Sequence, residues 1–192
     1  MKLNARRMVA FLLLIVLSVG FGIAFDAVAT AIERHRYPKE SAIDSILQDN
    51  SAEFGLPEPV LWAVIRTESG FVSNAVGEDG SIGLMQLTPT QFDLICVSIL
   101  NEDAKDSGML YDPKTNLRCG AALLSFLYQR YGVWETVYAA WHAGTDTVDA
   151  WLADPLLVTP QGTLLIPDPD TATYAETVAK AVKMYSQLYY EA

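Results

Sequence analysis

Apolar residues recur along most of the chain at three- and four-residue intervals, the spacing of one face of an α-helix. Between these segments lie stretches rich in glycine, proline or charged residues. No stretch alternates apolar and polar residues in the way a half-buried β-strand does. The sequence therefore predicts a mainly α-helical domain, with helices over about residues 41–54, 59–68, 88–100, 112–131, 134–141, 145–153 and 171–190.

The N-terminal part of the chain has a different pattern. Residues 8–25 form an apolar run without a charged side chain, and Lys2, Arg6 and Arg7 precede it. The run is longer than the roughly 7–15 apolar residues of a signal peptide and reaches the lower end of the roughly 17–25 that span a membrane. We interpret residues 1–30 as a signal anchor, that is, an uncleaved transmembrane segment.

A short charged linker over residues 31–41 is expected to join this anchor to the domain. The positively charged N-terminus predicts a single-pass protein of the cell membrane, with the domain on the extracytoplasmic side. The alternative is cleavage after Ala29 in an Ala-Val-Ala sequence, which would release a secreted protein.

Charge is distributed unevenly along the chain, whose formal net charge is −10. Residues 1–40 carry six Lys or Arg against three Asp or Glu, whereas residues 41–192 carry seven against twenty. An acidic domain without a basic patch argues against nucleic acid as a partner, because binding would require neutralised phosphates. It also disfavours anionic wall polymers, so an uncharged or mixed-charge glycan fits better.

The two cysteines, Cys96 and Cys119, form an even pair in a chain expected to be exported. A disulfide and two separate buried thiols are both consistent with this pattern. Their spacing matches no metal site, and no His, Cys and Asp cluster occurs elsewhere in the sequence. Nothing in the sequence indicates a metal, a cofactor or a protein partner.

One carboxylate interrupts the apolar pattern. Val60, Val64 and Glu68 follow one another at intervals of four residues, with Leu61 and Ile65 beside them, so Glu68 continues the apolar face of its helix. It stands in the last turn, near the negative end of the helix dipole. Both conditions disfavour ionisation and are expected to raise its pKa, as in a general acid. The alternative is a rotated helix that leaves Glu68 exposed.

The segment after this helix, residues 70–91, is rich in glycine and predicts a winding loop that approaches a ligand closely. Its sequence, A-V-G-E-D-G-S-I-G-L-M-Q-L-T-P-T after E-S-G-F, resembles the signature of the lytic transglycosylases with a soluble-transglycosylase (SLT, goose-lysozyme-like) catalytic domain. The pattern of that family is E-S-x-F followed by A-V-S-x-x-G-A-x-G-L-M-Q-x-x-P. Three later blocks also resemble the family, in its order: Y-D-P-K-T-N-L-R-C-G-A-A-L-L, A-A-W-H-A-G and I-P-D-P-D-T-A-T-Y.

The resemblance implies a lysozyme-like α-helical domain over residues 42–190, acting on the glycan strands of peptidoglycan. Such enzymes cleave the β-1,4 bond between N-acetylmuramic acid and N-acetylglucosamine and form a 1,6-anhydro ring. Glu68 aligns with their single general acid and base. Two alternatives remain open, a hydrolytic muramidase and a catalytically silent peptidoglycan-binding module.

Five further residues are carried over from the family motifs as candidates for substrate binding. Met85 and Gln86 align with G-L-M-Q, Trp141 and His142 replace the family's Tyr-Asn pair, and Tyr174 aligns with a late Tyr near the catalytic Glu. Four of them also have an ordinary interpretation: core packing for Met85 and Tyr174, loop hydrogen bonding for Gln86, and a structural role for His142.

The sequence departs from the family pattern at Gly77, where the family has Ser, at Trp-His for Tyr-Asn, and at Ala172, where the family has Arg. Because Glu68 is retained, we expect an active enzyme with an altered sugar cleft. Glu78 and Asp79 lie in the glycine loop, where acidic residues usually are solvated turn formers. If either positioned a water molecule, the enzyme would act as a lysozyme.

Overall fold

The structure, a computed structural model, describes residues 5–191. It divides into two units, one on each side of the boundary between Pro38 and Lys39.

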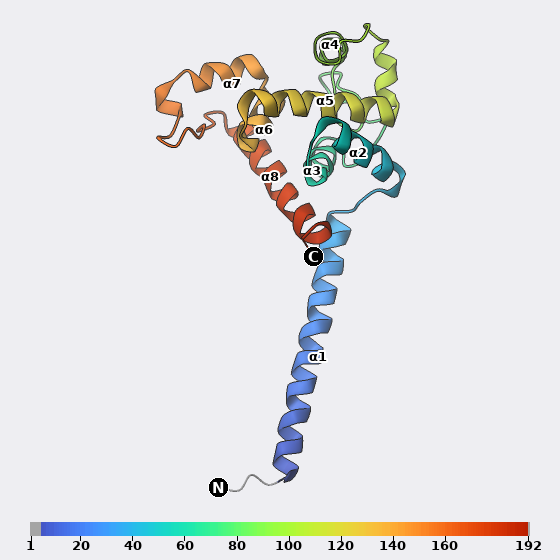
Figure 1. The fold of residues 1–192 in the computed structure, drawn as a ribbon, viewed down its shortest axis with the longest axis vertical. Helices are drawn as coiled ribbons and strands as arrows, with labels where there is room; N and C mark the ends of the chain where they lie inside the picture. Colours follow the sequence, from blue (N-terminus) through green and yellow to red (C-terminus); the bar gives the residue numbers. More distant parts are fainter. Residues whose placement is uncertain (1–4, 192) are drawn as a thin grey trace. The chain divides into compact units, whose positions relative to one another are not determined.

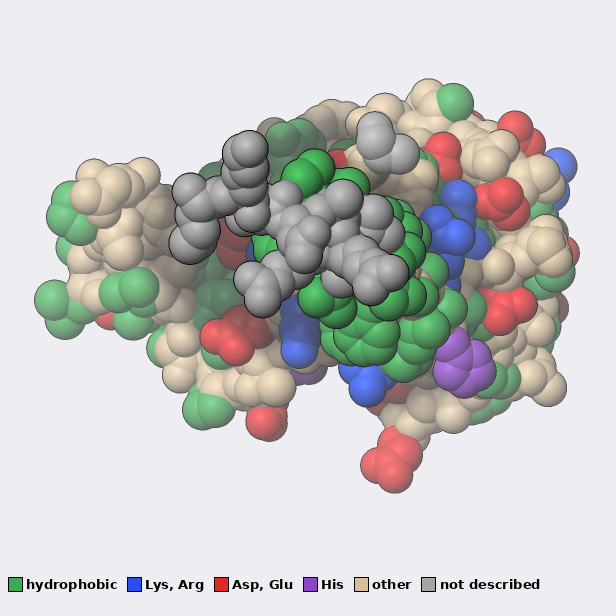
Figure 2. Space-filling view, turned by 90° about the horizontal axis from the view of Figure 1, so that it is seen from below, with side chains coloured by type: hydrophobic (Ala, Val, Ile, Leu, Met, Phe, Trp, Pro, Cys, Tyr) green, Lys and Arg blue, Asp and Glu red, His purple; other side chains and the backbone are tan. Residues whose placement is uncertain are grey.

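The first unit is a single long helix, α1, over Ala5–Arg36. From Phe11 onward it is long and apolar enough to cross a membrane, by length and composition. Hydrophobic side chains are exposed along it, and Figure 2 shows them covering the helix. The helix is longer than the anchor predicted over residues 1–30, because it continues through the charged residues to Arg36 and takes up half of the expected linker.

The second unit is helical (Figure 1), as the sequence predicted, and within the described residues the only β-structure is a few isolated bridges. Its α-helices are α2 (Ser41–Phe54), α3 (Glu58–Glu68), α4 (Pro89–Leu94), α5 (Pro113–Tyr131), α6 (Trp134–Ala143), α7 (Thr145–Leu152) and α8 (Pro169–Tyr189). A π-helical turn, η1 (Ile95–Ile99), continues α4, and two short 3-10 helices are η2 (Ser107–Tyr111) and η3 (Pro155–Leu157).

Helix α3 lies at the centre of this unit. Every side chain from Pro59 to Ile65 is buried, so the middle of the helix is enclosed on all sides and only its two ends reach a surface. It packs against α2 and α8, while α6 packs against α5 and α8. Trp62 is fully buried and stacks on Tyr185 of α8, with ring centroids 6.2 Å apart. This packing presents the end of α3, including Glu68, to the same region as α6 and α8.

Helices α4, α5 and α8 start with the same N-terminal motif, a capping side chain followed by proline. Thr88, Asp112 and Asp168 accept hydrogen bonds from backbone N–H groups in the first turns of α4, α5 and α8. Proline then occupies the first helical position, where the absence of an N–H costs nothing. The starting points of these helices are therefore encoded locally.

The loop between α3 and α4 is held from below by a buried asparagine of α5. The side chain of Asn116 is fully buried and accepts from the N–H of Met85 at 2.8 Å. Its amide nitrogen donates to the carbonyl oxygens of Ile82 at 2.8 Å and Leu110 at 3.0 Å. One side chain thus satisfies three buried backbone groups, two on the loop and one on η2, and so fixes the loop where it has no helix or strand of its own.

Replacing this asparagine tests its structural role. We expect Asn116→Ala to lower the free energy of unfolding of the helical unit by roughly 2–4 kcal/mol, because buried backbone groups lose their partners. Tryptophan fluorescence during urea unfolding measures this, since all four tryptophans lie after residue 39. Asn74→Ala makes the same change at an exposed position of the same loop and is expected to cost less than about 0.5 kcal/mol. Equal effects of the two changes would contradict the assignment.

Candidate active site

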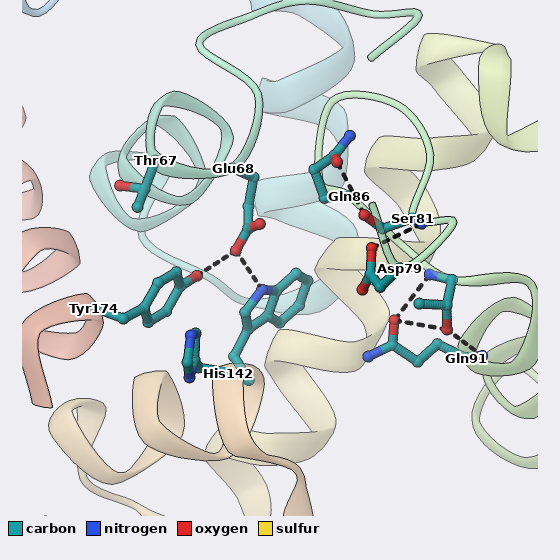
Figure 3. Close-up of a pocket in the computed structure, with 10 residues that line it drawn as sticks. Thr67, Glu68, Asp79, Ser81, Gln86, Gln91, His142 and Tyr174 are labelled. Carbon is teal, nitrogen blue, oxygen red and sulfur yellow. Dashed lines mark hydrogen bonds between the residues drawn. The ribbon is translucent and has the colours of Figure 1, made fainter. Parts of the chain in front are cut away.

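A cavity of about 390 Å³ opens where the end of α3, the glycine loop, α6 and α8 meet (Figure 3). Its lining is almost entirely polar, which suits a hydroxyl-rich ligand better than an apolar one. The lining residues are Thr67, Glu68, Asp79, Ser81, Gln86, Thr88, Gln91, Trp141, His142 and Tyr174.

Glu68 is the last residue of α3, and its carboxyl group receives two side-chain hydrogen bonds. The indole Nε1–H of Trp141, from α6, donates to Oε1 at 2.8 Å. The hydroxyl group of Tyr174, from α8, donates to the same oxygen. The structure assigns no hydrogen bond to Oε2 within residues 5–191. One carboxyl oxygen is therefore fixed by the protein, and the other is left for a ligand in the cavity.

The pKa of Glu68 is raised above its ordinary value, the direction that the sequence pattern predicted. Burial of the carboxyl group is the largest cause, because the charged form loses its hydration. The hydrogen bonds from Tyr174 and Trp141 act in the opposite direction, because they favour the carboxylate. The negative charge of Asp79 adds to the rise. Desolvation prevails, so the site favours a protonated Glu68.

His142 follows Trp141 on α6 and lies against Tyr174, with ring centroids 4.8 Å apart. The hydroxyl group of Thr171 donates to Asp168 at 2.6 Å, so its single proton is used. The Nδ1 atom of His142, 3.0 Å from that hydroxyl oxygen, must therefore be the donor. The remaining nitrogen, Nε2, is available to a ligand, while the chain of hydrogen bonds holds the ring beside Tyr174.

Gln86 lines the cavity, but its amide group serves mainly to hold the loop. The Nε2 group donates to the carbonyl oxygens of Gly83 at 2.8 Å and Ala75 at 3.3 Å. The Oε1 atom accepts from the Ser81 hydroxyl group at 2.9 Å. The backbone of Gln86 is left-handed, with φ of 47°, an uncommon conformation for a side chain without a short polar group. This side chain thus shapes the wall of the cavity.

Met85 does not reach the cavity. Its side chain is fully buried, and a Cβ atom on Gly120 of α5 would come within 2.2 Å of its sulfur. The glycine allows α5 to approach the loop closely, and the thioether fills the space between them. We therefore reassign Met85 from the substrate-binding residues to the core. Trp141, His142, Tyr174 and Gln86 are brought to one cavity with Glu68.

Several residues of the site were not proposed from the sequence. Ser69 donates to the carbonyl oxygen of Leu84 at 2.7 Å and so ties the end of α3 to the loop. Its place directly after Glu68 in the E-S motif was the available signal. Ser81 and Asp79 also line the cavity. Asp79 is exposed and accepts a hydrogen bond from the N–H of Ser81 at 3.1 Å, so it is also the solvated turn former that the sequence indicated. A local pattern does not reveal on which side of a winding loop a side chain lies.

Within the described part of the chain, no group of three or more His, Cys, Asp or Glu side chains is arranged to hold a metal ion. Cys96 of η1 and Cys119 of α5 are both buried free thiols. Burial raises the pKa of the Cys119 thiol to about 12, so this group is held in its neutral form.

Comparison with known proteins places this geometry in context. The family described as “Transglycosylase SLT domain” matches residues 45–155. A curated relative, the transglycosylase of Enterobacteria phage PRD1, is 35% identical over 98 residues, which cover 50% of this chain and 32% of the phage protein. The membrane-bound lytic murein transglycosylase C of Yersinia pestis is 29% identical over 87 residues, 45% of this chain and 24% of that protein.

Among solved structures, the lytic transglycosylase Slt of Pseudomonas aeruginosa resembles this fold with a TM-score of 0.70 and 27% sequence identity. The match covers 80% of this chain and 25% of that protein, so the lysozyme-like fold predicted from the sequence is confirmed. The Pseudomonas protein was solved as an inactive mutant in which a glutamate is replaced by glutamine. The chain spans about a third or less of the length of these relatives.

The burial of Glu68 has a consequence for stability. Because its pKa is higher in the folded than in the unfolded state, the folded state binds more protons between the two values, and stability falls as pH rises through that window. We expect Glu68→Gln to be more stable than the wild type above the folded-state pKa, with the difference vanishing below about pH 4, under the ordinary pKa of Glu. Thermal unfolding at a series of pH values measures this.

Glu78→Gln is the matched control for this stability measurement, because Glu78 is exposed. It is expected to leave the stability unchanged within about 0.5 kcal/mol at every pH. A Glu68→Gln protein less stable than the wild type at neutral pH would show that the carboxylate is favourably bound in the fold.

Proposed function

Because the chain belongs to the transglycosylase SLT family, we propose that it is a lytic transglycosylase of peptidoglycan. In this proposal it cleaves the β-1,4 bond between N-acetylmuramic acid and N-acetylglucosamine and closes a 1,6-anhydro ring on the muramic residue. Glu68 is the single general acid and base of this ring closure. The proposal rests mainly on the geometry of the Glu68 carboxyl group. Its Oε1 accepts hydrogen bonds from two donors, and its Oε2 is open to the cavity.

In the first step Glu68 acts as an acid. Its raised pKa favours the protonated form, and with Oε1 already accepting from Trp141 and Tyr174, the proton belongs on Oε2, which faces the cavity. Transfer of this proton to the glycosidic oxygen lets the bond to C1 of the muramic residue break. Positive charge then develops at C1, where the substrate's N-acetyl group stabilises it in the manner implied by the family.

In the second step Glu68, now a carboxylate, acts as a base. The N–H of Trp141 and the O–H of Tyr174 stabilise the negative charge, which is the state that both donors favour. The carboxylate removes the proton from the C6 hydroxyl group, whose oxygen bonds to C1 and closes the ring. Glu68 is thereby protonated again, so the cycle is balanced without water or a cofactor.

The location of the enzyme is part of the proposal. The apolar helix α1 anchors the chain in the cell membrane, with the basic N-terminus inside and the helical unit on the extracytoplasmic side, where peptidoglycan lies. The membrane-bound relative from Yersinia pestis supports an anchored form. The apolar side chains along this helix are exposed, and a lipid bilayer would remove them from water.

Digestion of purified peptidoglycan by the full-length protein in detergent, followed by mass spectrometry, tests the activity. We expect fragments whose muramic ends are lighter by one water than hydrolysis products. Glu68→Gln preserves the shape of the site but lacks a transferable proton, and we expect a loss of release of at least about a hundredfold.

Other outcomes of this digestion identify the alternatives. Exclusively hydrated ends would indicate a hydrolytic muramidase. Retention of the wild-type protein on peptidoglycan without any release, unchanged in Glu68→Gln, would indicate a binding module and contradict the proposal.

The indole donor of Trp141 is expected to set the pH range of activity. The rate of an acid-catalysed step falls as pH rises through the pKa of the acid. The Trp141 hydrogen bond lowers the pKa of Glu68, so its removal in Trp141→Phe is expected to shift the alkaline limb of the pH–rate profile to higher pH. The activity of the variant at its optimum is expected to be lower, because Oε1 is positioned less firmly.

Trp134→Phe provides the matched control, since Trp134 stacks on Tyr128 with centroids 4.4 Å apart and does not line the cavity. Its pH–rate profile is expected to keep the wild-type limbs. An unchanged or lowered alkaline limb in Trp141→Phe would contradict the assigned role of the indole.

A further inference from the structure

The glycine loop departs from the family pattern at two linked positions. Where the family reads A-V-S-x-x-G-A, this chain reads A-V-G-E-D-G-S, so a serine is absent at Gly77 and one is gained at Ser81. Position 79, which is variable in the pattern, is an aspartate. These residues lie together at the cavity, and their geometry shows why the changes belong together.

The absence of a side chain at Gly77 creates the space that its neighbours occupy. A Cβ atom there would lie 2.3 Å from the Ser81 hydroxyl oxygen, 2.7 Å from Oδ1 of Asp79 and 3.0 Å from Oε1 of Gln86. The first two distances are shorter than any real contact allows. A serine at this position is therefore incompatible with the present placement of Ser81 and Asp79.

Ser81 donates hydrogen bonds to the side chains of Asp79 and Gln86 beside Gly77. Its backbone N–H donates to Oδ1 of Asp79 at 3.1 Å, and its hydroxyl group donates to Oε1 of Gln86 at 2.9 Å. Figure 3 shows the Asp79 carboxyl group within the cavity, directed toward the side on which Glu68 lies. Asp79 and its neighbour Glu78 are both exposed to solvent, but of the two only Asp79 lines the cavity.

The pKa values of Glu68 and Asp79 are shifted in opposite directions. Burial raises the pKa of Glu68, and the charge of Asp79 raises it further, whereas hydrogen bonds from Ser81 lower the pKa of Asp79. Two carboxyl groups that line one cavity and differ in this way form an arrangement by which glycosidases divide the roles of acid and base.

We infer that Asp79 is a second catalytic carboxylate, which directs a water molecule to C1 and gives this enzyme a hydrolytic outcome beside ring closure. The inference rests on the proposed function, since both outcomes share the first step at Glu68. It goes beyond that function because the fate of the cleaved muramic residue depends on a residue at a variable position of the family motif.

The hydrolytic branch is balanced with water as its only co-reactant. Glu68 gives its proton to the leaving glycosidic oxygen as the bond from C1 to that oxygen breaks. A water oxygen bonds to C1, and Asp79 takes one of its protons. The product is a muramic residue with a free hemiacetal at C1, and proton exchange with solvent returns both carboxyl groups to their starting states. In the other branch the C6 oxygen bonds to C1 instead.

The two products are distinguished by borohydride, which reduces a free hemiacetal but not a 1,6-anhydro ring. Peptidoglycan is digested with the full-length protein in detergent, reduced and analysed by mass spectrometry, and a parallel digest with Glu68→Gln gives the pre-existing ends. We expect the wild type to form both kinds of end. In Asp79→Asn we expect the ratio of reducible to anhydro ends to fall at least about tenfold while anhydro ends are still produced.

Glu78→Gln removes the adjacent exposed carboxylate and is expected to leave this ratio unchanged. A second variant, Gly77→Ser combined with Ser81→Ala, restores the family residues and places a Cβ atom where Asp79 now lies. It is expected to lower the ratio as Asp79→Asn does, with ring closure retained.

The inference is overturned if the wild type forms only anhydro ends, if Asp79→Asn leaves the ratio within about twofold, or if it abolishes both products together. Continued release by Glu68→Gln would instead overturn the proposed function itself, so the two failures are distinguishable.

Discussion

The burial of one carboxyl group at the end of α3 is the constraint on which the rest of this structure depends. A charged Glu68 is costly in this position, and the fold compensates only in part, with two donors directed at one of its oxygens. If hydrogen bonds offset the whole cost of burying the charge, the carboxylate would be a weaker base and would hold a proton less firmly. Burial is therefore what raises the pKa of the group, as the proposed acid role requires, and the two donors stabilise the carboxylate that this role would produce.

Holding this balance requires that three helices and a loop keep their relative positions. The fully buried helix α3 fixes the backbone of Glu68, and the pairing of α6 and α8 with each other fixes the two donors. The loop packs apolar side chains such as Met85 into the core, and polar side chains also position it. Asn116 binds it from α5, Ser69 from the end of α3, and Gln86 from within the loop. These buried hydrogen bonds replace regular secondary structure where the backbone must remain open to a ligand.

The cleft also shows how substitutions at separate positions compensate one another. A serine hydroxyl is absent at Gly77 and present at Ser81, so the local polarity stays similar. The space left at Gly77 admits the carboxyl group of Asp79, which accepts a hydrogen bond from the N–H of Ser81. Trp141 and His142 replace a Tyr-Asn pair, yet an indole N–H still reaches Glu68 and an imidazole still offers hydrogen-bonding atoms beside Tyr174. The retained chemistry therefore depends on the atoms presented to the cavity more than on residue identity at each position.

The sequence alone determined the elements of this protein and the identity of its central residue. Helical periodicity, capping residues such as Asp112 and the uniform apolarity of residues 8–25 are local properties, so they predicted the helices of the domain and the apolar anchor helix. The apolar face of α3 likewise singled out Glu68. Only the tertiary structure decided that Met85 belongs to the core, that Trp141 and Tyr174 meet on a single oxygen, and that Asp79 enters the cavity while Glu78 does not. These relations join residues distant in sequence or depend on the path of a winding loop, and neither is encoded in a local pattern.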